Sequence, residues 1–218
     1  MPVCKDEETA HDILRRLDHS DTSHIVLDVE TSGLDWQRDY IVGYVITFGS
    51  KEEDNWYVPV RHQGNNLVDF QAPLNSKIWA TASKMPSYPF EMDLSSVLKS
   101  RGSSLRLIGH NLAFDLRFLN RHRISVGTNI YEDTLINASL LNEYRRSYSL
   151  DACCKSAGVE AKLGEELYEY LYDKFGGSKG RRQIGTFWQL SGDDELGTEY
   201  ALGDGTSTYQ LYQHQQSY

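Results

Sequence analysis

Three β-rich apolar runs fall within the first 60 residues, and most later segments with a clear period favour a helix. The strand-like runs are His24–Glu30, Ile41–Phe48 and Trp56–Val60, and the polar turn Gly49–Asn55 separates the last two. Such a turn predicts a hairpin or meander, so we expect an antiparallel edge to a sheet. A fourth strand is predicted at Leu105–Gly109, directly before a helix. Early strands, late helices and one strand–helix unit between them fit a mixed α/β sheet flanked by helices.

Helices are predicted where apolar residues recur at spacings of three and four. They cover Glu7–Asp18, Glu91–Ser100, Asn111–His122, Asp133–Glu143, Ser149–Ala157, Glu165–Phe175 and Glu195–Gln213. Asn111 is expected to cap its helix. The segment Gln63–Pro89 is proline-rich and weakly periodic, so we expect a long connection with room for a short helix. Gly176–Arg182 is expected to form a basic, flexible loop.

A length of 218 residues suits one domain, which we place over 1–218, with 1–22 as an N-terminal helical extension and a core of about 23–214. The sequence contains no run of about 18 apolar residues, the length that a membrane helix needs, and no secretory signal. We therefore expect no membrane partner and a cytoplasmic location. The net charge of −9 argues against a broad basic binding surface, but carboxylates that hold cations would also lower it.

The strand His24–Glu30 ends in two acids whose side chains share one face. Side chains at positions i and i+2 of a strand point the same way, so Asp28 and Glu30 lie side by side. Two acids on one face of an apolar strand repel each other and lose hydration, a cost that folding alone rarely accepts. Divalent cations such as Mg²⁺, which prefer hard oxygen ligands, would remove that conflict. Taken alone, the pair more often marks a solvated strand end.

A third acid follows the strand at Leu105–Gly109. Asp115 lies about one turn into the helix that is predicted to begin near Asn111. An acid in the first turns of a helix interacts favourably with the helix dipole, so an exposed Asp115 needs no functional explanation by itself.

The last predicted helix carries a fourth acid behind a tyrosine. Tyr200, Asp204, Thr208 and Leu211 fall on one helical stripe because spacings of three and four repeat there. A tyrosine one turn before an aspartate can place its hydroxyl beside a water that the aspartate's metal holds. By itself, the pattern also suits a core tyrosine on an amphipathic helix. The combination of the three acidic segments is far more specific than any one of them.

In order, these segments resemble the three exonuclease motifs of the DEDDy group. The matching residues are Asp28-Val-Glu30-Thr31-Ser-Gly-Leu34, then His110-Asn111 with Phe114-Asp115, then Tyr200-x-x-x-Asp204. The chain looks most like the proofreading exonuclease domain of family A DNA polymerases, the bacterial polymerase I type. The resemblance runs from about Ile25 to Leu211 and is weak over 63–104 and 161–199. It implies an RNase H-like (DnaQ-like) fold with a mixed five-stranded sheet flanked by helices.

The resemblance also implies an activity, a metal-dependent 3′→5′ exonuclease that releases nucleoside 5′-monophosphates from single-stranded DNA. Two divalent cations, Mg²⁺ or Mn²⁺, roughly 3.5–4 Å apart would stabilise the attacking and leaving oxygens. Carried over by motif, Asp28, Glu30 and Asp204 would hold one cation. Asp28 would bridge to the second cation, which Asp115 would hold directly or through its waters. Tyr200, which starts protonated because its ordinary pKa is about 10, would orient the attacking water.

Three substrate contacts are implied in the same way. Thr31 resembles the residue that meets the 3′-hydroxyl, and Leu34 resembles the apolar wedge between the last two bases. Asn111 resembles a residue that contacts the terminal nucleotide. For Leu34, ordinary loop packing is an equal alternative. His62 and His110 are expected to be hydrogen-bonded structural residues, because hard-oxygen Mg²⁺ sites seldom use imidazole.

Two other functions stay open on the same fold. One is an RNase D-like 3′→5′ exoribonuclease, which would differ in how it senses the 2′-hydroxyl. The other is a non-catalytic nucleic-acid-binding module, although the presence of all four acids and the tyrosine argues against it. The partners we expect are single-stranded DNA 3′ ends, with RNA as the alternative, and a polymerase module or replication proteins. A phage-encoded enzyme would fit this pattern.

Overall fold

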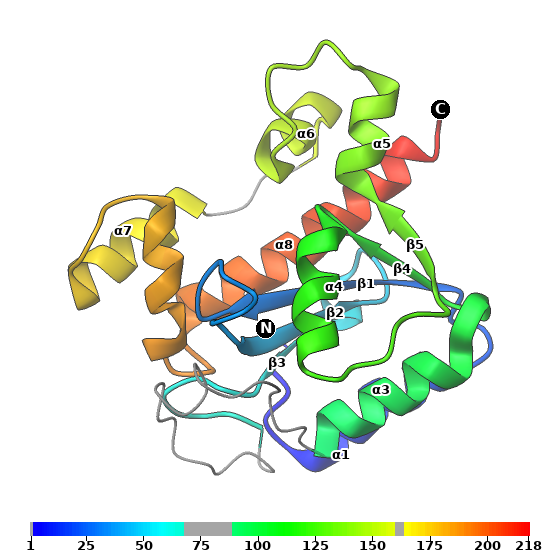
Figure 1. Ribbon diagram of the computed structural model, residues 1–218, viewed down its shortest axis with the longest axis horizontal. Helices are drawn as coiled ribbons and strands as arrows, with labels where there is room; N and C mark the ends of the chain where they lie inside the picture. The colour runs from blue at the N-terminus through cyan, green and yellow to red at the C-terminus, as the bar shows by residue number, and fades with distance from the viewer. Residues whose placement is uncertain (1, 68–88, 160–163) are drawn as a thin grey trace.

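The computed structural model describes residues 2–67, 89–159 and 164–218, and within them one five-stranded sheet runs in the order β3-β2-β1-β4-β5 (Figure 1). Antiparallel pairing joins β1 to β2 and β2 to β3, whereas β1 with β4 and β4 with β5 are parallel. The predicted mixed sheet with an antiparallel edge is therefore confirmed. The strands are β1 (His24–Thr31), β2 (Ile41–Thr47), β3 (Asn55–Pro59), β4 (Arg106–Gly109) and β5 (Ile130–Asp133).

The helices agree with the predicted ones to within a few residues at each end. They are α1 (Glu7–Asp18), α3 (Pro89–Arg101), α4 (Leu112–Arg121), α5 (Thr134–Leu141), α6 (Leu150–Ala157), α7 (Gly164–Phe175) and α8 (Glu195–Gln215). The 3₁₀ segments are η1 (Glu52–Asp54), η2 (Gly102–Ser104) and η3 (Arg181–Gln189). No described helix is both long and apolar enough to span a membrane. The short helix expected within 63–89 falls largely on residues 68–88, which lie outside the described residues.

Alternation along β1 divides the molecule into two layers. Ile25 and Val29 point into a core that includes residues of α1, α3 and α4. Val26 points to the other face, where it packs against tyrosines of α8. Asp28 and Glu30 lie two and four residues after Val26 on the same strand, so their side chains point to the same face, toward α8. Figure 1 shows α8 running across this face of the sheet, with α7 to one side of its first half.

The predicted N-terminal helix is part of the main core. Ile13, Leu14 and Leu17 of α1 are buried in the same cluster as residues of β1, β2 and α3. Asp6 caps the helix by accepting the Thr9 N–H at 2.8 Å. The apolar face that the sequence predicted is therefore confirmed.

Three local predictions were incomplete or wrong. No pattern located β5, because this strand is short and its first two residues, Ile130 and Tyr131, are exposed. Asn111 does not cap α4 through its side chain: its φ of 64° is left-handed, and Asp133 accepts the N–H groups of Asn111 and Leu112 at 2.9 Å each. The basic loop predicted at 176–182 gives way at Arg181 to a 3₁₀ helix.

Candidate active site

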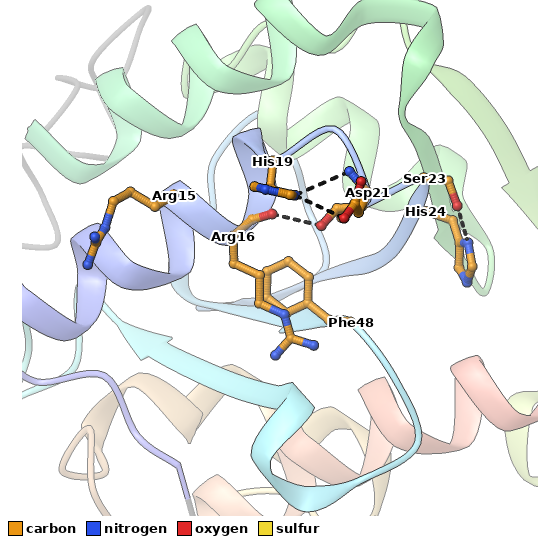
Figure 2. Close-up of a pocket in the computed structure, with 8 residues that line it drawn as sticks. Arg15, Arg16, His19, Asp21, Ser23, His24 and Phe48 are labelled. Atoms are coloured by element: carbon orange, nitrogen blue, oxygen red, sulfur yellow. Dashed lines mark hydrogen bonds and ion pairs between the residues drawn. The ribbon is translucent and has the colours of Figure 1, made fainter.

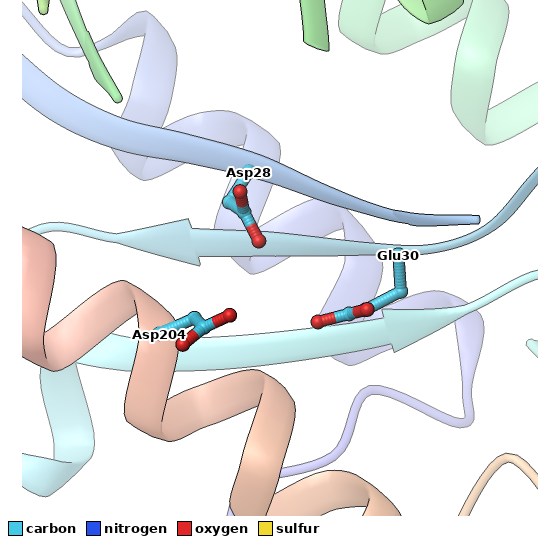
Figure 3. A group of neighbouring side chains, drawn as sticks. All are labelled: Asp28, Glu30 and Asp204. Atoms are coloured by element: carbon cyan, nitrogen blue, oxygen red, sulfur yellow. The ribbon is translucent and has the colours of Figure 1, made fainter. Parts of the chain in front are cut away.

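Three acids meet between β1 and α8. Single carboxylate oxygens of Asp28, Glu30 and Asp204 all lie within 4.8 Å of one another. Figure 3 shows Asp28 and Glu30 reaching from β1 toward Asp204 on α8. Glu30 is only 5% exposed, so solvent does little to screen the repulsion among the three.

A glycine lets α8 approach the sheet closely enough to bring Asp204 there. A Cβ on Gly205 would lie 2.6 Å from Val45 Cγ1 and closer still to Thr47 Oγ1, so only glycine fits at this crossing without a shift. The Asn55 side chain of β3 then fastens the helix, donating to the Leu202 carbonyl at 2.8 Å. The sequence signal was a glycine inside a helix beside a predicted ligand, which indicates a close backbone approach.

Asp115 reaches the same strand from α4. The ladder between β1 and β4 ends at Val26, so beyond it β1 has no β4 partner. The Val29 N–H donates instead to Asp115 Oδ1 at 3.3 Å. Burial, and then the negative charge of Asp28, raise the pKa of the Asp115 carboxyl well above its ordinary value. Asp115 is therefore electrostatically coupled to the three-acid group without belonging to it.

The donor set suits a hard cation. Carboxylate oxygens are the ligands that Mg²⁺ and Mn²⁺ prefer, and the described part of the chain brings no cysteine or histidine into this group. Bringing like charges this close costs free energy unless protons or cations compensate. The cluster therefore fits divalent cations bound by Asp28, Glu30 and Asp204, with Asp115 within electrostatic reach.

Tyr200 lies one turn before Asp204, on the same side of α8. It is buried, and burial followed by the charges of Asp204 and Glu30 raises its pKa well above 10. Its hydroxyl therefore stays protonated at neutral pH. Phe187 of η3 packs against its ring at a centroid distance of 6.2 Å.

The three predicted substrate contacts differ in exposure. Thr31 ends β1 and is buried, and its hydroxyl donates to the Gly33 carbonyl at 2.6 Å. Leu34 follows in the loop between β1 and β2 and is 54% exposed. Asn111 is exposed at the start of α4. Leu34 and Asn111 are therefore accessible, whereas the Thr31 side chain is buried and its hydroxyl is already bonded.

The loop that carries Leu34 is held by hydrogen bonds. Asp39 accepts the Asp35 N–H at 2.8 Å, and Arg121 of α4 donates to the Trp36 carbonyl at 2.9 Å. Leu34 therefore projects from a loop of defined shape.

His62 and His110 both make structural hydrogen bonds. His62 is buried between the Tyr57 hydroxyl and the Leu190 carbonyl, and burial lowers its pKa to about 4. His110 contacts the Thr134 hydroxyl and the Tyr148 carbonyl at 2.9 Å each. Neither imidazole belongs to the acidic group, in line with the expectation that they are structural.

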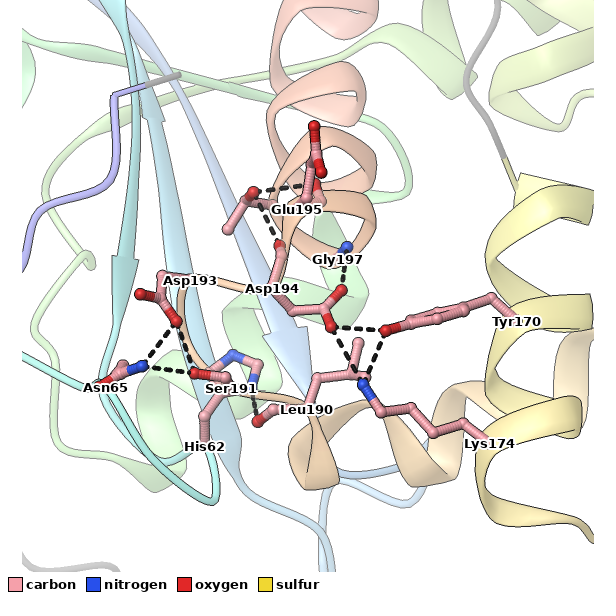
Figure 4. A network of polar contacts seen from close by, with 11 residues as sticks. His62, Asn65, Tyr170, Lys174, Leu190, Ser191, Asp193, Asp194, Glu195 and Gly197 are labelled. Carbon is pink, nitrogen blue, oxygen red and sulfur yellow. Dashed lines mark hydrogen bonds and ion pairs between the residues drawn. The ribbon is translucent and has the colours of Figure 1, made fainter.

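The first turn of α8 is anchored by a polar network (Figure 4). Asp194 caps the helix by accepting the Gly197 N–H at 3.0 Å. The same carboxylate accepts from the Tyr170 hydroxyl at 2.8 Å and from Lys174 Nζ at 3.3 Å, both on α7. No local sequence pattern predicts this network, because α7 and Asp194 are distant along the chain.

A pocket of about 520 Å³ lies away from the acids, between the end of α1 and the start of β1 (Figure 2). His24 lines this pocket and lies four residues before Asp28 on β1. Along a strand that separates the two residues by roughly 13 Å. The arginines beside it are paired with acids, Arg15 with Asp12 and Arg16 with Asp54. The charge of these arginines is therefore already largely compensated.

The chain belongs to the 3′–5′ exonuclease family, whose model matches residues 1–216. This family model is that of the exonuclease domain of family A DNA polymerases. DNA polymerase DpoZ of Salmonella phage PMBT28 is 30% identical over 196 residues, which are 89% of this chain and 26% of that polymerase. The chain thus spans about a quarter of the length of this curated relative.

Solved structures share the fold at lower identity. Brucella melitensis NrnC matches 100% of this chain and 81% of its own, with a TM-score of 0.59 and 19% identity. NrnC has been solved with bound pGG and with bound Mg²⁺. Escherichia coli RNase D, an exoribonuclease involved in structured RNA processing, matches 99% of this chain and 45% of its own, with a TM-score of 0.56 and 15% identity. These matches confirm the RNase H-like exonuclease fold.

Proposed function

We propose that residues 1–218 act as one exonuclease unit that removes nucleotides from the 3′ end of single-stranded DNA with two divalent cations. The observation that carries the proposal is the meeting of Asp28, Glu30 and Asp204 within 4.8 Å, with Asp115 hydrogen-bonded to the same strand. Bound cations would supply a water of lowered pKa and would offset charge on the scissile phosphate.

Each side chain has a separate task in this proposal. Asp28, Glu30 and Asp204 would hold the cation beside the attacking water, and Asp28 and Asp115 the one beside the leaving oxygen. Tyr200 would hydrogen-bond to the water and fix its direction, which a protonated phenol can do without removing a proton. The products would be nucleoside 5′-monophosphates.

Thr31, Leu34 and Asn111 would hold the terminal nucleotides. Thr31 lies directly after Glu30, and because its side chain is buried, its backbone would make the contact to the 3′-hydroxyl. The exposure of Leu34 and Asn111 suits contacts to unpaired bases, which bind apolar surfaces without sequence preference.

DNA is favoured over RNA because the curated relative is a DNA polymerase. A polymerase module, in the same chain or as a partner, would supply the 3′ end for proofreading. The likeness to RNase D keeps RNA as the second substrate to test.

The test is degradation of 5′-labelled single-stranded DNA and RNA with Mg²⁺ or Mn²⁺. We expect a ladder that shortens from the 3′ end, faster on DNA, and that disappears with EDTA or in Asp28→Ala/Glu30→Ala. Glu165→Ala/Glu166→Ala, which removes two exposed acids of α7, is the matched control and should keep the activity. Degradation that persists in the Asp28/Glu30 double variant would refute the assignment of the site. Faster cleavage of RNA would favour the exoribonuclease.

A further inference from the structure

Tyr200 is bracketed by two aromatic residues that do not belong to α8. Phe187 of η3 lies on one side, and Tyr168 of α7 lies at a ring-centroid distance of 6.5 Å, tilted by 55°. The hydroxyl groups of Tyr168 and Tyr200 are hydrogen-bonded to each other. Tyr168 therefore touches the one side chain of the site that is proposed to orient water.

This hydrogen bond restricts the Tyr200 hydroxyl. A phenol has one proton to donate and lone pairs to accept with. Burial, then the charges of Asp204 and Glu30, and then the contacts with Tyr168 raise the pKa of Tyr200, so its hydroxyl keeps its proton. The bond between the two hydroxyls leaves Tyr200 one direction fewer in which to donate or accept.

We propose that Tyr168 is a positioning residue for the exonuclease reaction: its hydroxyl, bonded to that of Tyr200, fixes the direction in which the Tyr200 hydroxyl meets the attacking water. A hydroxyl held in one direction holds the water that it contacts in one place, at the distance and angle that attack on the phosphorus requires. The inference rests on the proposed function of the site.

The fold holds the two tyrosines in this relation. Two residues after Tyr168, the Tyr170 hydroxyl donates to Asp194, the residue that caps α8 (Figure 4). Lys174, one turn further along α7, contacts the same carboxylate at 3.3 Å. Because α7 and α8 are joined at this point, the Tyr168 hydroxyl has a fixed position relative to Tyr200.

The test is a double-mutant cycle on single-stranded DNA with saturating Mg²⁺, using Tyr168→Phe, Tyr200→Phe and the double variant. Tyr168→Phe keeps the ring and removes only the hydroxyl. We expect kcat to fall about tenfold, the effect of one ordinary hydrogen bond, with KM changed by less than about twofold. In the Tyr200→Phe background the same change should alter kcat by less than about twofold. Tyr172→Phe, on the same helix, is the matched control and should leave kcat unchanged.

Two results would overturn the inference while leaving the exonuclease assignment intact. One is wild-type kcat in Tyr168→Phe. The other is an equal loss of kcat in both backgrounds, which would mean that Tyr168 acts on stability or packing rather than through Tyr200. Absence of cleavage by the folded wild-type protein on both DNA and RNA would instead refute the proposed function itself.

Discussion

Replacing Gly205 by alanine tests whether the close approach of α8 to the sheet places Asp204. The new Cβ would lie 2.6 Å from Val45 Cγ1 and 3.0 Å from Asn55 Oδ1, and nearer still to Thr47 Oγ1. Valine and threonine are β-branched and stiff, so these neighbours cannot swing away cheaply. The helix itself must therefore move.

The size of the effect follows from these distances. Ordinary contact begins near 3.4 Å, so the helix must retreat by about 1 Å at a cost of about 1–3 kcal/mol. Alanine returns about 1 kcal/mol through its better helix propensity, so stability should fall by only about 1 kcal/mol, or about 2–4 °C in Tm. Activity should fall far more, on the order of 10²-fold in kcat, because Asp204 shifts with the backbone.

The assay is single-stranded DNA degradation at saturating Mg²⁺, beside thermal unfolding of the same samples. Gly127→Ala is the control, because a Cβ there meets nothing within 4 Å. It should leave both kcat and Tm unchanged. A Gly205→Ala protein with wild-type kcat would show that the crossing distance of α8 does not control the site.

Three further predictions concern stability and substrate binding. Glu91→Gln should lower the free energy of unfolding by about 3–5 kcal/mol in urea titrations, because the Arg61 guanidinium, fully buried, would lose its bidentate carboxylate partner. A loss of less than 1 kcal/mol would contradict this. Burial lowers the pKa of His62 and His122 in the folded protein to about 4, whereas in the unfolded chain both imidazoles bind protons near pH 6.5. The free energy of unfolding should therefore decline as the pH falls from about 6.5 to about 4. A urea midpoint that is equal at pH 7 and pH 5 would argue against this. Leu34→Ala should raise KM for single-stranded DNA several-fold while leaving Tm unchanged, because its side chain is 54% exposed; an unchanged KM would indicate ordinary loop packing.

Local sequence patterns predicted most of the fold. Four of the five strands and the helices were located because side-chain direction repeats every two residues in a strand and about every 3.6 in a helix. The fifth strand, β5, was missed because two of its four residues are exposed and its sequence shows no alternation. Residues 130–133 form a strand because their backbone pairs with β4. That pairing depends on a distant segment, so the sequence of 130–133 does not reveal it.

Part of the candidate site was equally visible along the chain. Asp28 and Glu30 share a face because they are two residues apart on a strand, and Tyr200 and Asp204 share a stripe because they are four apart on a helix. What joined these two local pairs, and Asp115, was the resemblance to a family and not a spacing. Sequence patterns therefore identified the groups but not the distances between them.

The sequence by itself determined which side chains share a face, since that depends only on backbone geometry within one element. The tertiary structure decided how far apart the faces lie. Gly205 permits the close crossing of α8, and α7 brings Tyr168 to Tyr200. The β1–β4 ladder ends at Val26, so the Val29 N–H can donate to Asp115. These contacts join residues that are distant along the chain, so they depend on packing between elements and leave no periodic trace in the sequence.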